Sequence, residues 1–366
     1  MKFKINSNTF ADKLNLVQGI AEKRATMPIL SHLLLNVEKG KIKITSTDLE
    51  TTMCLWCEAS VEKESSLAIP SRKLFEIVKE LQNVEMEFEE IGNNWLQIKT
   101  ASASFKIAGL SPEDFPSIPE VSTANLFSIN SAKLEDMISK TIFSVSPDEL
   151  RRNLSGIFFE KTGDKGLRLI ATDGHRLSYI DYESENDLGL AKNVLVPKKA
   201  VSELRKILRF SDEILIGAEN NFFVSKVDDT VLYSRLIDAD FPDYRQVTPD
   251  TTKNRFKVNT THLLSALKRV SIFSSEKTRS VKVSLNKNEL LLISVAPEVG
   301  EAKESILIEY SGEPMEIGFN SRYIMDVLEA IGETVVIFGI SDELSPTVIR
   351  PESGDHYVNV VMPMRV

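Results

Sequence analysis

The sequence predicts an α+β protein made of three repeated domains, each with two helices and several antiparallel strands. Three observations lead to this fold class. Each third of the chain opens with an Asn or Ser residue and an amphipathic segment of helical period, at residues 8–22, 130–145 and 259–273. A second helical segment recurs after Pro70, Pro197 and Asn320. Between the helices, apolar and polar residues alternate with period two, as they do in half-buried strands.

The landmarks of the repeat keep a nearly constant spacing. The turns Thr47-Asp48 and Thr172-Asp173 begin 125 residues apart, and Phe115-Pro116 recurs 126 residues later as Phe241-Pro242. The prolines at 70 and 197 are 127 residues apart and suit the first turn of a helix. Proline-rich connectors surround residues 112–119 and 241–249. We therefore expect domains at residues 1–120, 121–250 and 251–366.

Strands and turns alternate within each repeat. In the first repeat the period-two pattern predicts strands at 33–37, 42–45, 86–88 and 96–98. Turns are expected at Gly40, at Gly92 with Asn93, and at Gly163 with Asp164 of the second repeat.

Composition indicates a soluble protein of a reducing compartment. Of 366 residues, 42% are hydrophobic and 27% charged, and no apolar run approaches the ~18 residues of a membrane span. The N-terminal residues lack the apolar region of a signal peptide. Two cysteines in this length favour the cytoplasm. The net charge of −9, taken alone, argues against a nucleic-acid partner.

A polar corner at residues 171–177, Ala-Thr-Asp-Gly-His-Arg-Leu, is the centre of the second repeat. It follows one apolar run and precedes another, so Thr172, Asp173 and Gly174 are expected to form a tight hairpin turn. This corner should present the Thr172 hydroxyl, the His175 imidazole and the Arg176 guanidinium on an exposed rim. Such a rim suits ligand binding.

Other chemical candidates have simple structural interpretations. Cys54 and Cys57 form C-x-x-C, but the strand alternation puts Cys57 on the buried face and Cys54 on the other, so the two sulfurs diverge. His175 suits a general base, yet the chain lacks the G-x-S-x-G elbow and the G-x-x-x-x-G-K-[ST] phosphate loop. The other three histidines show no i,i+4 pairing that would indicate a metal site.

Several motifs of the chain resemble those of a known family. They are TDGHRL from Thr172, FPDYR from Phe241, GFN-x-x-Y from Gly318 and VVMPMR from Val360. By these motifs and their spacing, the whole chain resembles the bacterial DNA polymerase sliding clamps, the β subunits of DNA polymerase III. The N-terminal MKF and the turn at 47–50 fit the same family.

This resemblance implies a DNA clamp fold and a head-to-tail homodimer, closed into a ring around double-stranded DNA. Three similar units per chain suit such an arc, and two arcs close through a heterologous contact. The ring confers processivity on the replicative polymerase, binds DNA without sequence specificity and catalyses no reaction. The resemblance implies no metal, no cofactor and no membrane partner.

The resemblance also implies a pocket for short linear motifs. Its expected partners are the polymerase catalytic subunit, the clamp loader, repair polymerases and mismatch-repair proteins. The floor is expected from Leu154, Thr172, Leu177, Pro242, Val247, Val360 and Met362, and the surroundings from Gly174, His175, Arg176, Asn320, Tyr323, Pro363, Met364 and Arg365. Gln246 stands where relatives often carry Arg, and the last residue is Val366 where Leu is more usual. Both departures bear on peptide preference.

Charge is distributed unevenly between the helices and the remainder of the chain. Six predicted helical stretches carry a net +7, which leaves −16 on the other residues. Helices on an inner wall would therefore meet phosphates with positive charge. The DNA contacts expected from the resemblance are Arg24, Arg151, Arg152, Lys198, Lys199 and Arg205. The alternative for each is a solvated surface charge.

The resemblance places the subunit boundary between the first and third domains. Phe105 and Ile107 lie on the last strand of the first domain, and Ile272 and Phe273 end the opening helix of the third. Lys73 is expected to face Glu301 or Glu304 of the partner subunit. Two other interpretations stay open: a cytoplasmic hydrolase centred on His175, and a monomeric peptide-binding scaffold that does not bind DNA.

Overall fold

The computed structural model describes residues 1–21, 27–118, 123, 126–184, 188–249, 252–275 and 277–365. The chain forms two compact units, one of residues 1–135 and 189–236, the other of residues 136–188 and 237–366. Within the described residues no helix is long and apolar enough to cross a membrane.

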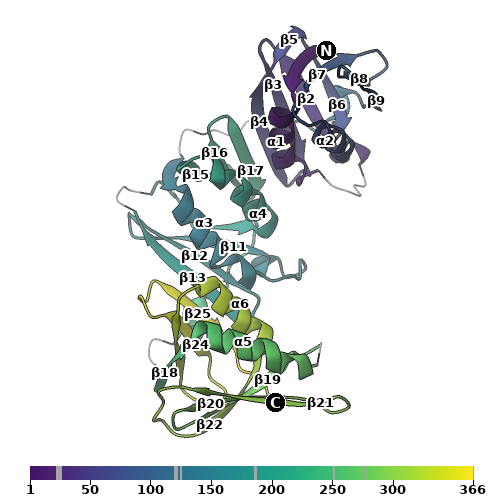
Figure 1. Ribbon diagram of the computed structural model, residues 1–366. Helices are drawn as coiled ribbons and strands as arrows, with labels where there is room; N and C mark the ends of the chain where they lie inside the picture. The colour runs from purple at the N-terminus through teal and green to yellow at the C-terminus, as the bar shows by residue number, and fades with distance from the viewer. Residues whose placement is uncertain are drawn as a thin grey trace. The chain divides into compact units, whose positions relative to one another are not determined.

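Six α-helices occur in the described part of the chain (Figure 1): α1 (Ser7–Val17), α2 (Ser71–Glu80), α3 (Ser131–Ser139), α4 (Lys198–Ile207), α5 (Thr260–Val270) and α6 (Ser321–Ile331). All lie in segments predicted to be helical. α1, α3 and α5 are shorter than predicted. α1 ends before Gly19, where an added Cβ would lie 2.5 Å from the Lys206 Nζ of α4, so a small residue permits this close approach. α3 ends because the Thr141 hydroxyl bonds back to the Met137 carbonyl at 2.8 Å, and a 3-10 turn follows.

The two helix-start prolines are placed differently from the prediction. Pro70 and Pro197 each end a strand and act as the N-cap residue, so neither lies within the first helical turn. A proline at this position needs no amide hydrogen for the helix, since the N-cap amide lies outside the intrahelical bonds.

The first unit contains two antiparallel sheets. The smaller follows the order β5 (Ser60–Lys63), β1 (Lys2–Asn6), β7 (Glu85–Glu90), β8 (Trp95–Lys99), β9 (Ser104–Ala108). The larger follows the order β10 (Phe127–Asn130), β15 (Glu213–Glu219), β16 (Phe222–Val227), β17 (Thr230–Arg235), β4 (Thr51–Glu58), β3 (Lys41–Thr47), β2 (His32–Glu38), β6 (Ser65–Pro70). β14 (Val194–Pro197) precedes α4. The four strands predicted in the first repeat are β2, β3, β7 and β8, which confirms them.

The second unit is built in the same way. One sheet contains, in order, β11 (Gly156–Thr162), β12 (Gly166–Thr172), β13 (Arg176–Glu183), β25 (Tyr357–Val361), β24 (Thr347–Pro351), β23 (Val335–Ile340), β18 (Asn254–Asn259). The other contains β21 (Gly300–Leu307), β20 (Glu289–Ala296), β19 (Ser280–Asn286), β22 (Met315–Asn320). α5 and α6 lie side by side in this unit (Figure 1).

The predicted repeat is visible in the order of the elements. Within the described residues, one strand and a helix are followed by four strands, a second helix and three strands, and this order occurs three times with β5 as an addition in the first. The chain forms two compact units rather than three because two sheets continue from one repeat into the next. β17 pairs with β4 in one sheet, and β25 pairs with β13 in the other. The domain boundaries near residues 120 and 250 stay predictions.

The turns and cysteines test local features of the prediction. Gly40, Gly92 and Gly163 have positive φ angles of 79°, 98° and 71°, as tight hairpin turns require. Cys54 and Cys57 are both unpaired and buried, so the expectation that Cys57 alone of the two lies on a buried face was wrong. β4 is an inner strand covered on both sides, and Cys54 packs there against Val224 and Tyr233. Burial raises the pKa of the Cys57 thiol to about 12, which keeps it an unreactive thiol.

Candidate functional site

The corner at 172–176 is a tightly bonded turn between β12 and β13. The Thr172 hydroxyl donates to the Arg176 carbonyl at 2.6 Å. Asp173 Oδ1 accepts from the backbone N–H groups of His175 and Arg176 at 2.9 and 3.0 Å. Gly174 has φ +88°, and an added Cβ would meet Arg151 Nη2 at 2.7 Å. The hairpin prediction is confirmed.

The same bonding recurs in the first repeat, between β3 and β4. Asp48 Oδ1 accepts from the N–H groups of Glu50 and Thr51 at 2.9 and 2.6 Å. The Thr47 hydroxyl accepts from the Leu49 N–H at 3.1 Å, as the Thr172 hydroxyl accepts from the Gly174 N–H at 3.1 Å. The threonine and aspartate therefore build the corner in both repeats. What distinguishes the second corner is what surrounds it.

The expected exposed rim was wrong for two of its three groups. The Thr172 hydroxyl is used within the turn, and the Arg176 side chain is only 10% exposed. Its guanidinium donates to Asp173 Oδ2 at 3.1 Å, to Asp326 Oδ2 of α6 at 2.6 Å and to the Phe143 carbonyl at 2.5 Å. Three N–H groups of the guanidinium are therefore used in hydrogen bonds within the protein, and the bond to Asp326 connects the corner to α6. His175 is exposed.

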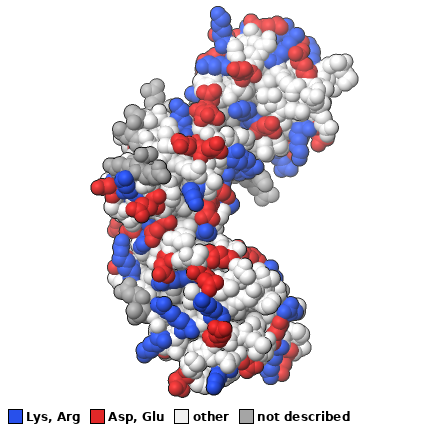
Figure 2. Space-filling view, turned by 60° about the vertical axis from the view of Figure 1, so that its left-hand side comes forward, with Lys and Arg blue, Asp and Glu red and all other residues white. Residues whose placement is uncertain are grey.

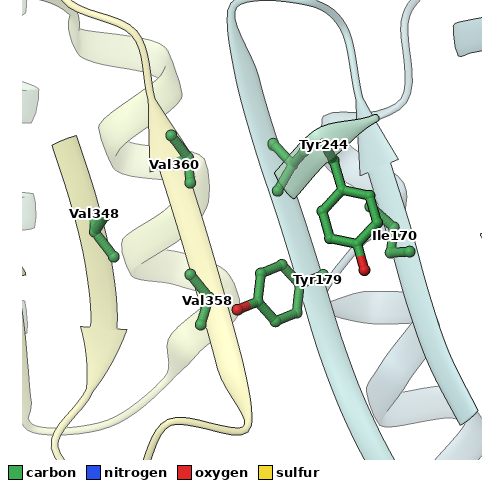
Figure 3. Close-up of a cluster of buried hydrophobic side chains, with 7 residues drawn as sticks. Ile170, Tyr179, Tyr244, Val348, Val358 and Val360 are labelled. Carbon is green, nitrogen blue, oxygen red and sulfur yellow. The ribbon is translucent and has the colours of Figure 1, made fainter. Parts of the chain in front are cut away.

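An apolar cavity of about 270 Å³ lies beside the corner. All seven predicted floor residues line it, together with Gly174 and Arg176. They converge because Leu177 lies directly opposite Val360 in the pairing of β13 with β25. The cavity shares Leu177, Tyr244 and Val360 with a buried cluster, and Figure 3 shows Tyr179 of that cluster directed toward Val358. The cavity therefore rests on a packed core.

Four residues that the sequence did not assign to this pocket also line it: Arg151, Asn153, Asp243 and Tyr244. Arg151 was predicted to contact DNA, but its guanidinium donates to the Asp173 carbonyl at 2.8 Å and so bounds the cavity. Asp243 and Tyr244 belong to the FPDYR motif, and that motif was the available signal for both.

The other predicted pocket residues are absent from the lining of the cavity. The His175 and Tyr323 rings stack with centroids 6.4 Å apart, and the Arg176 guanidinium lies 4.5 Å from the Tyr323 ring centroid. Met364 N donates to the Gly318 carbonyl at 2.8 Å, which anchors the C-terminal strand end. Asn320 is the N-cap of α6, Pro363 is half-buried and Arg365 is exposed. Val366 lies outside the described residues.

The predicted DNA residues occur in different electrostatic settings. Arg24 lies outside the described residues, and Arg152 is exposed. Lys199 forms an ion pair with Asp48 Oδ2, and Arg205 Nη2 donates to Glu135 Oε1 at 2.6 Å. Lys198 is half-buried at the start of α4. Two of the predicted contacts are therefore already compensated by carboxylates.

The charge difference between helices and the remainder is smaller than predicted. Within the observed bounds, the net charge is +1 for α2, +3 for α4 and +2 for α5. It is zero for α1 and −1 for each of α3 and α6. On the face shown in Figure 2, acidic and basic side chains are intermingled. Positive charge is concentrated on α4 and α5 rather than on all six helices.

The predicted interface residues lie on two sheet edges and the segments beside them. β9 is an edge strand of its sheet, with Phe105 half-buried and Ile107 buried within its own unit. β21 is an edge strand of another sheet, and Ile272 after α5 is 74% exposed. Within the chain, Lys73 pairs with Glu76, Glu301 with Lys303 and Glu304 with Arg269. The Ile107 side chain is therefore buried within its own unit, while its strand, β9, has one unpaired edge in the described residues.

The structure has three repeats, each of two helices and antiparallel strands, and an apolar cavity beside the C-terminal strand. This fold and this cavity define the class of DNA clamps. Family models agree over nearly the whole chain: the N-terminal, central and C-terminal domains of the DNA polymerase III β subunit match residues 1–119, 128–243 and 245–365. The chain belongs to the bacterial DNA polymerase III β subunit family, the β sliding clamps.

Individual relatives support this assignment over their full lengths. The β sliding clamps of Vibrio cholerae and Escherichia coli K12 are each 33% identical to the chain, with 100% of both proteins covered. A sliding clamp from Bartonella birtlesii bound to griselimycin superimposes with a TM-score of 0.96 at 31% identity, and one from Pseudomonas aeruginosa bound to griselimycin with 0.94 at 32%. In both comparisons the matched region covers 100% of this chain and 100% of the other chain.

Proposed function

We propose that two copies of this chain close head to tail into a ring around duplex DNA and tether the replicative polymerase to its template in the cytoplasm. The ring catalyses no reaction. Its pocket receives short linear motifs of the polymerase catalytic subunit, the clamp loader, repair polymerases and mismatch-repair proteins in turn. Family membership supports the ring, and the cavity beside the Thr172–Arg176 corner supports the pocket.

The cavity is the observation that carries the peptide-binding role. Its volume of about 270 Å³ suits one or two large apolar side chains, and Leu154, Leu177 and Val360 of its floor are buried while Val247 is 38% exposed at the entrance. Each Leu or Phe anchor that enters contributes about 1.5–3 kcal/mol, and each hydrogen bond about 1 kcal/mol. After the cost of ordering the peptide, a micromolar affinity near −8 kcal/mol is expected, which suits partners that exchange.

DNA contact in this proposal is electrostatic and independent of sequence. Arg24, Arg152, Lys198, Lys199 and Arg205 supply positive charge to the phosphates. Such contacts are screened by salt, so topology rather than affinity keeps the ring on DNA. Edge strands β9 and β21 of different copies, with Ile272 and Phe273 beside them, form the proposed subunit boundary.

The pocket is tested by binding of a fluorescein-labelled hexapeptide that contains one Gln, one Leu and one Phe, with griselimycin as a second probe. Val247→Asp puts a charge at the cavity entrance and should abolish binding of both probes. The matched control is Leu49→Asp in the equivalent corner of the first repeat, where Leu49 is also exposed. It should bind both probes like the unmodified chain. Unchanged binding by Val247→Asp would overturn the site.

A further inference from the structure

One wall of the cavity comes from a connector that has no strand of its own. Pro242, Asp243, Tyr244 and Val247 line the cavity from this connector, and its regular structure is a single 3-10 turn, Tyr244–Val247. Among the described residues, the backbone hydrogen bonds of residues 237–247 stay within the connector, as from Thr248 N to the Arg245 carbonyl at 3.3 Å. Side chains must therefore attach this wall to the sheet.

A row of alternating charges crosses the sheet beside the wall. Glu160 of β11 lies opposite Arg168 of β12, and Arg168 lies opposite Asp181 of β13. Arg168 binds Asp181 in a two-point fork, Nε to Oδ1 at 2.6 Å and Nη2 to Oδ2 at 2.7 Å. The fork geometry fixes the guanidinium plane. The remaining Nη1 group of Arg168 is directed at the connector.

Tyr244 inserts its hydroxyl between two members of this row. The hydroxyl donates to Glu160 Oε2 at 2.6 Å and accepts from Arg168 Nη1 at 2.9 Å. The next connector residue, Arg245, donates from Nη2 to Glu160 Oε1 at 2.7 Å, so both carboxylate oxygens hold the connector. Burial raises the pKa of Tyr244 to about 12, and the hydroxyl therefore keeps its proton at physiological pH.

The two ends of Tyr244 face different surroundings. Its ring lines the cavity and packs in the cluster with Leu177 and Val360, whereas its hydroxyl ends at the buried carboxylate of Glu160. Removing the hydroxyl changes the attachment of the wall without changing the apolar surface that a ligand meets.

We propose that Glu160 and Arg168 are positioning residues of the pocket, which act through Tyr244 to hold the connector wall where a peptide anchor needs it. Neither residue lines the cavity. A wall that is already in place spares the ligand the cost of ordering it, and this is the general source of affinity by preorganisation. The inference rests on the proposed peptide-binding role of the cavity.

The test uses Tyr244→Phe and Glu160→Gln in the full-length chain. Each should bind the labelled hexapeptide about tenfold more weakly, a loss of about 1.4 kcal/mol. In Tyr244→Phe, amide hydrogen exchange at 241–248 should quicken in the free protein and be suppressed again by saturating peptide. The double variant should bind no more weakly than the worse single one, because the two residues share one bond.

The matched control is Tyr357→Phe. Tyr357 is another buried tyrosine, its hydroxyl donates to the Lys140 carbonyl at 2.8 Å, and alternation on β25 puts it on the sheet face opposite Val358 and Val360. It should lose comparable thermal stability yet bind the hexapeptide normally. Affinity of Tyr244→Phe within twofold of the unmodified chain, or equal weakening in Tyr357→Phe, would overturn the inference. A different result would show that the cavity is not the peptide site: the Val247→Asp variant would then still bind the hexapeptide.

Discussion

Tyr233 of β17 occupies, beside the first corner, the register position that Val360 of β25 occupies beside the second. Val360 lies opposite Leu177, four residues after Asp173, and Tyr233 lies opposite Thr52, four residues after Asp48. Tyr233 packs against Cys54 and Val224 in a buried cluster. A large tyrosine side chain therefore stands beside one corner at the position where the smaller valine stands beside the other.

This relationship predicts that Val360→Tyr closes the pocket. The added ring should occupy the cavity and exclude both apolar anchors, so peptide affinity should fall by at least about 100-fold, given about 1.5–3 kcal/mol per anchor. Calorimetric titration with the hexapeptide measures this. Tyr233→Val, at the equivalent position, is the control and should bind peptide normally. Peptide binding by a folded Val360→Tyr chain at full affinity would show that the anchors enter elsewhere.

Much of the fold and of the pocket floor could be predicted, because these features repeat or are local. Helical periodicity and the recurrence after Pro70, Pro197 and Asn320 located the six helices of the described residues, and the family resemblance supplied all seven floor residues. The helix ends were less predictable because they depend on single contacts, such as Gly19 against Lys206 and the Thr141 hydroxyl on the Met137 carbonyl.

The burial of Arg176 could not be predicted from its neighbours in sequence. Its main ion-pair partner, Asp326, lies 150 residues away on α6. Likewise, Cys54 is covered by Val224 and Tyr233 from another repeat. Local alternation shows which residues share a face, but it does not show what later segments place over that face.

Arg176 should be a stability residue as well as a pocket residue. Arg176→Ala leaves Asp173 and Asp326 as nearly buried carboxylates without their common partner, and breaking such a pair costs about 3–5 kcal/mol. Arg322 binds the same Asp326 but is 53% exposed, so Arg322→Ala should cost less than about 1 kcal/mol. Urea unfolding of the two variants gives the comparison. Equal losses would mean that burial of Arg176 is energetically unimportant.

Glu135 should weaken DNA binding by compensating Arg205. Glu135→Gln should steepen the dependence of log affinity on log salt by about 0.9, the value for one more phosphate contact. Fluorescence anisotropy with a short labelled duplex measures the slope. The control, Glu62→Gln, removes an exposed carboxylate of β5 that pairs with Lys2 of β1. If the two variants give the same slope, α3 and α4 do not face the phosphates.

The subunit boundary should depend on Ile272 and Phe273. Ile272 is exposed, and Phe273 lies over Gly300, the first residue of edge strand β21. Because burial of each side chain contributes about 1.5–3 kcal/mol, truncating both to Ala should give monomers at micromolar concentration. Leu150→Ala, at a leucine that is 93% exposed, should leave the dimer intact. Sedimentation that still shows a dimer for the double variant would mean that the boundary is misplaced.

Retention on DNA of different topology tests the ring most directly. The chain is loaded by its cognate loader onto a nicked circular plasmid, separated from free protein, and the plasmid is then either left circular or cut once with a restriction enzyme. A closed ring held by topology stays on the circle and slides off the linear copy, so gel filtration should find the chain with the circular DNA and lose it from the linear DNA. Equal retention on both forms would contradict the account.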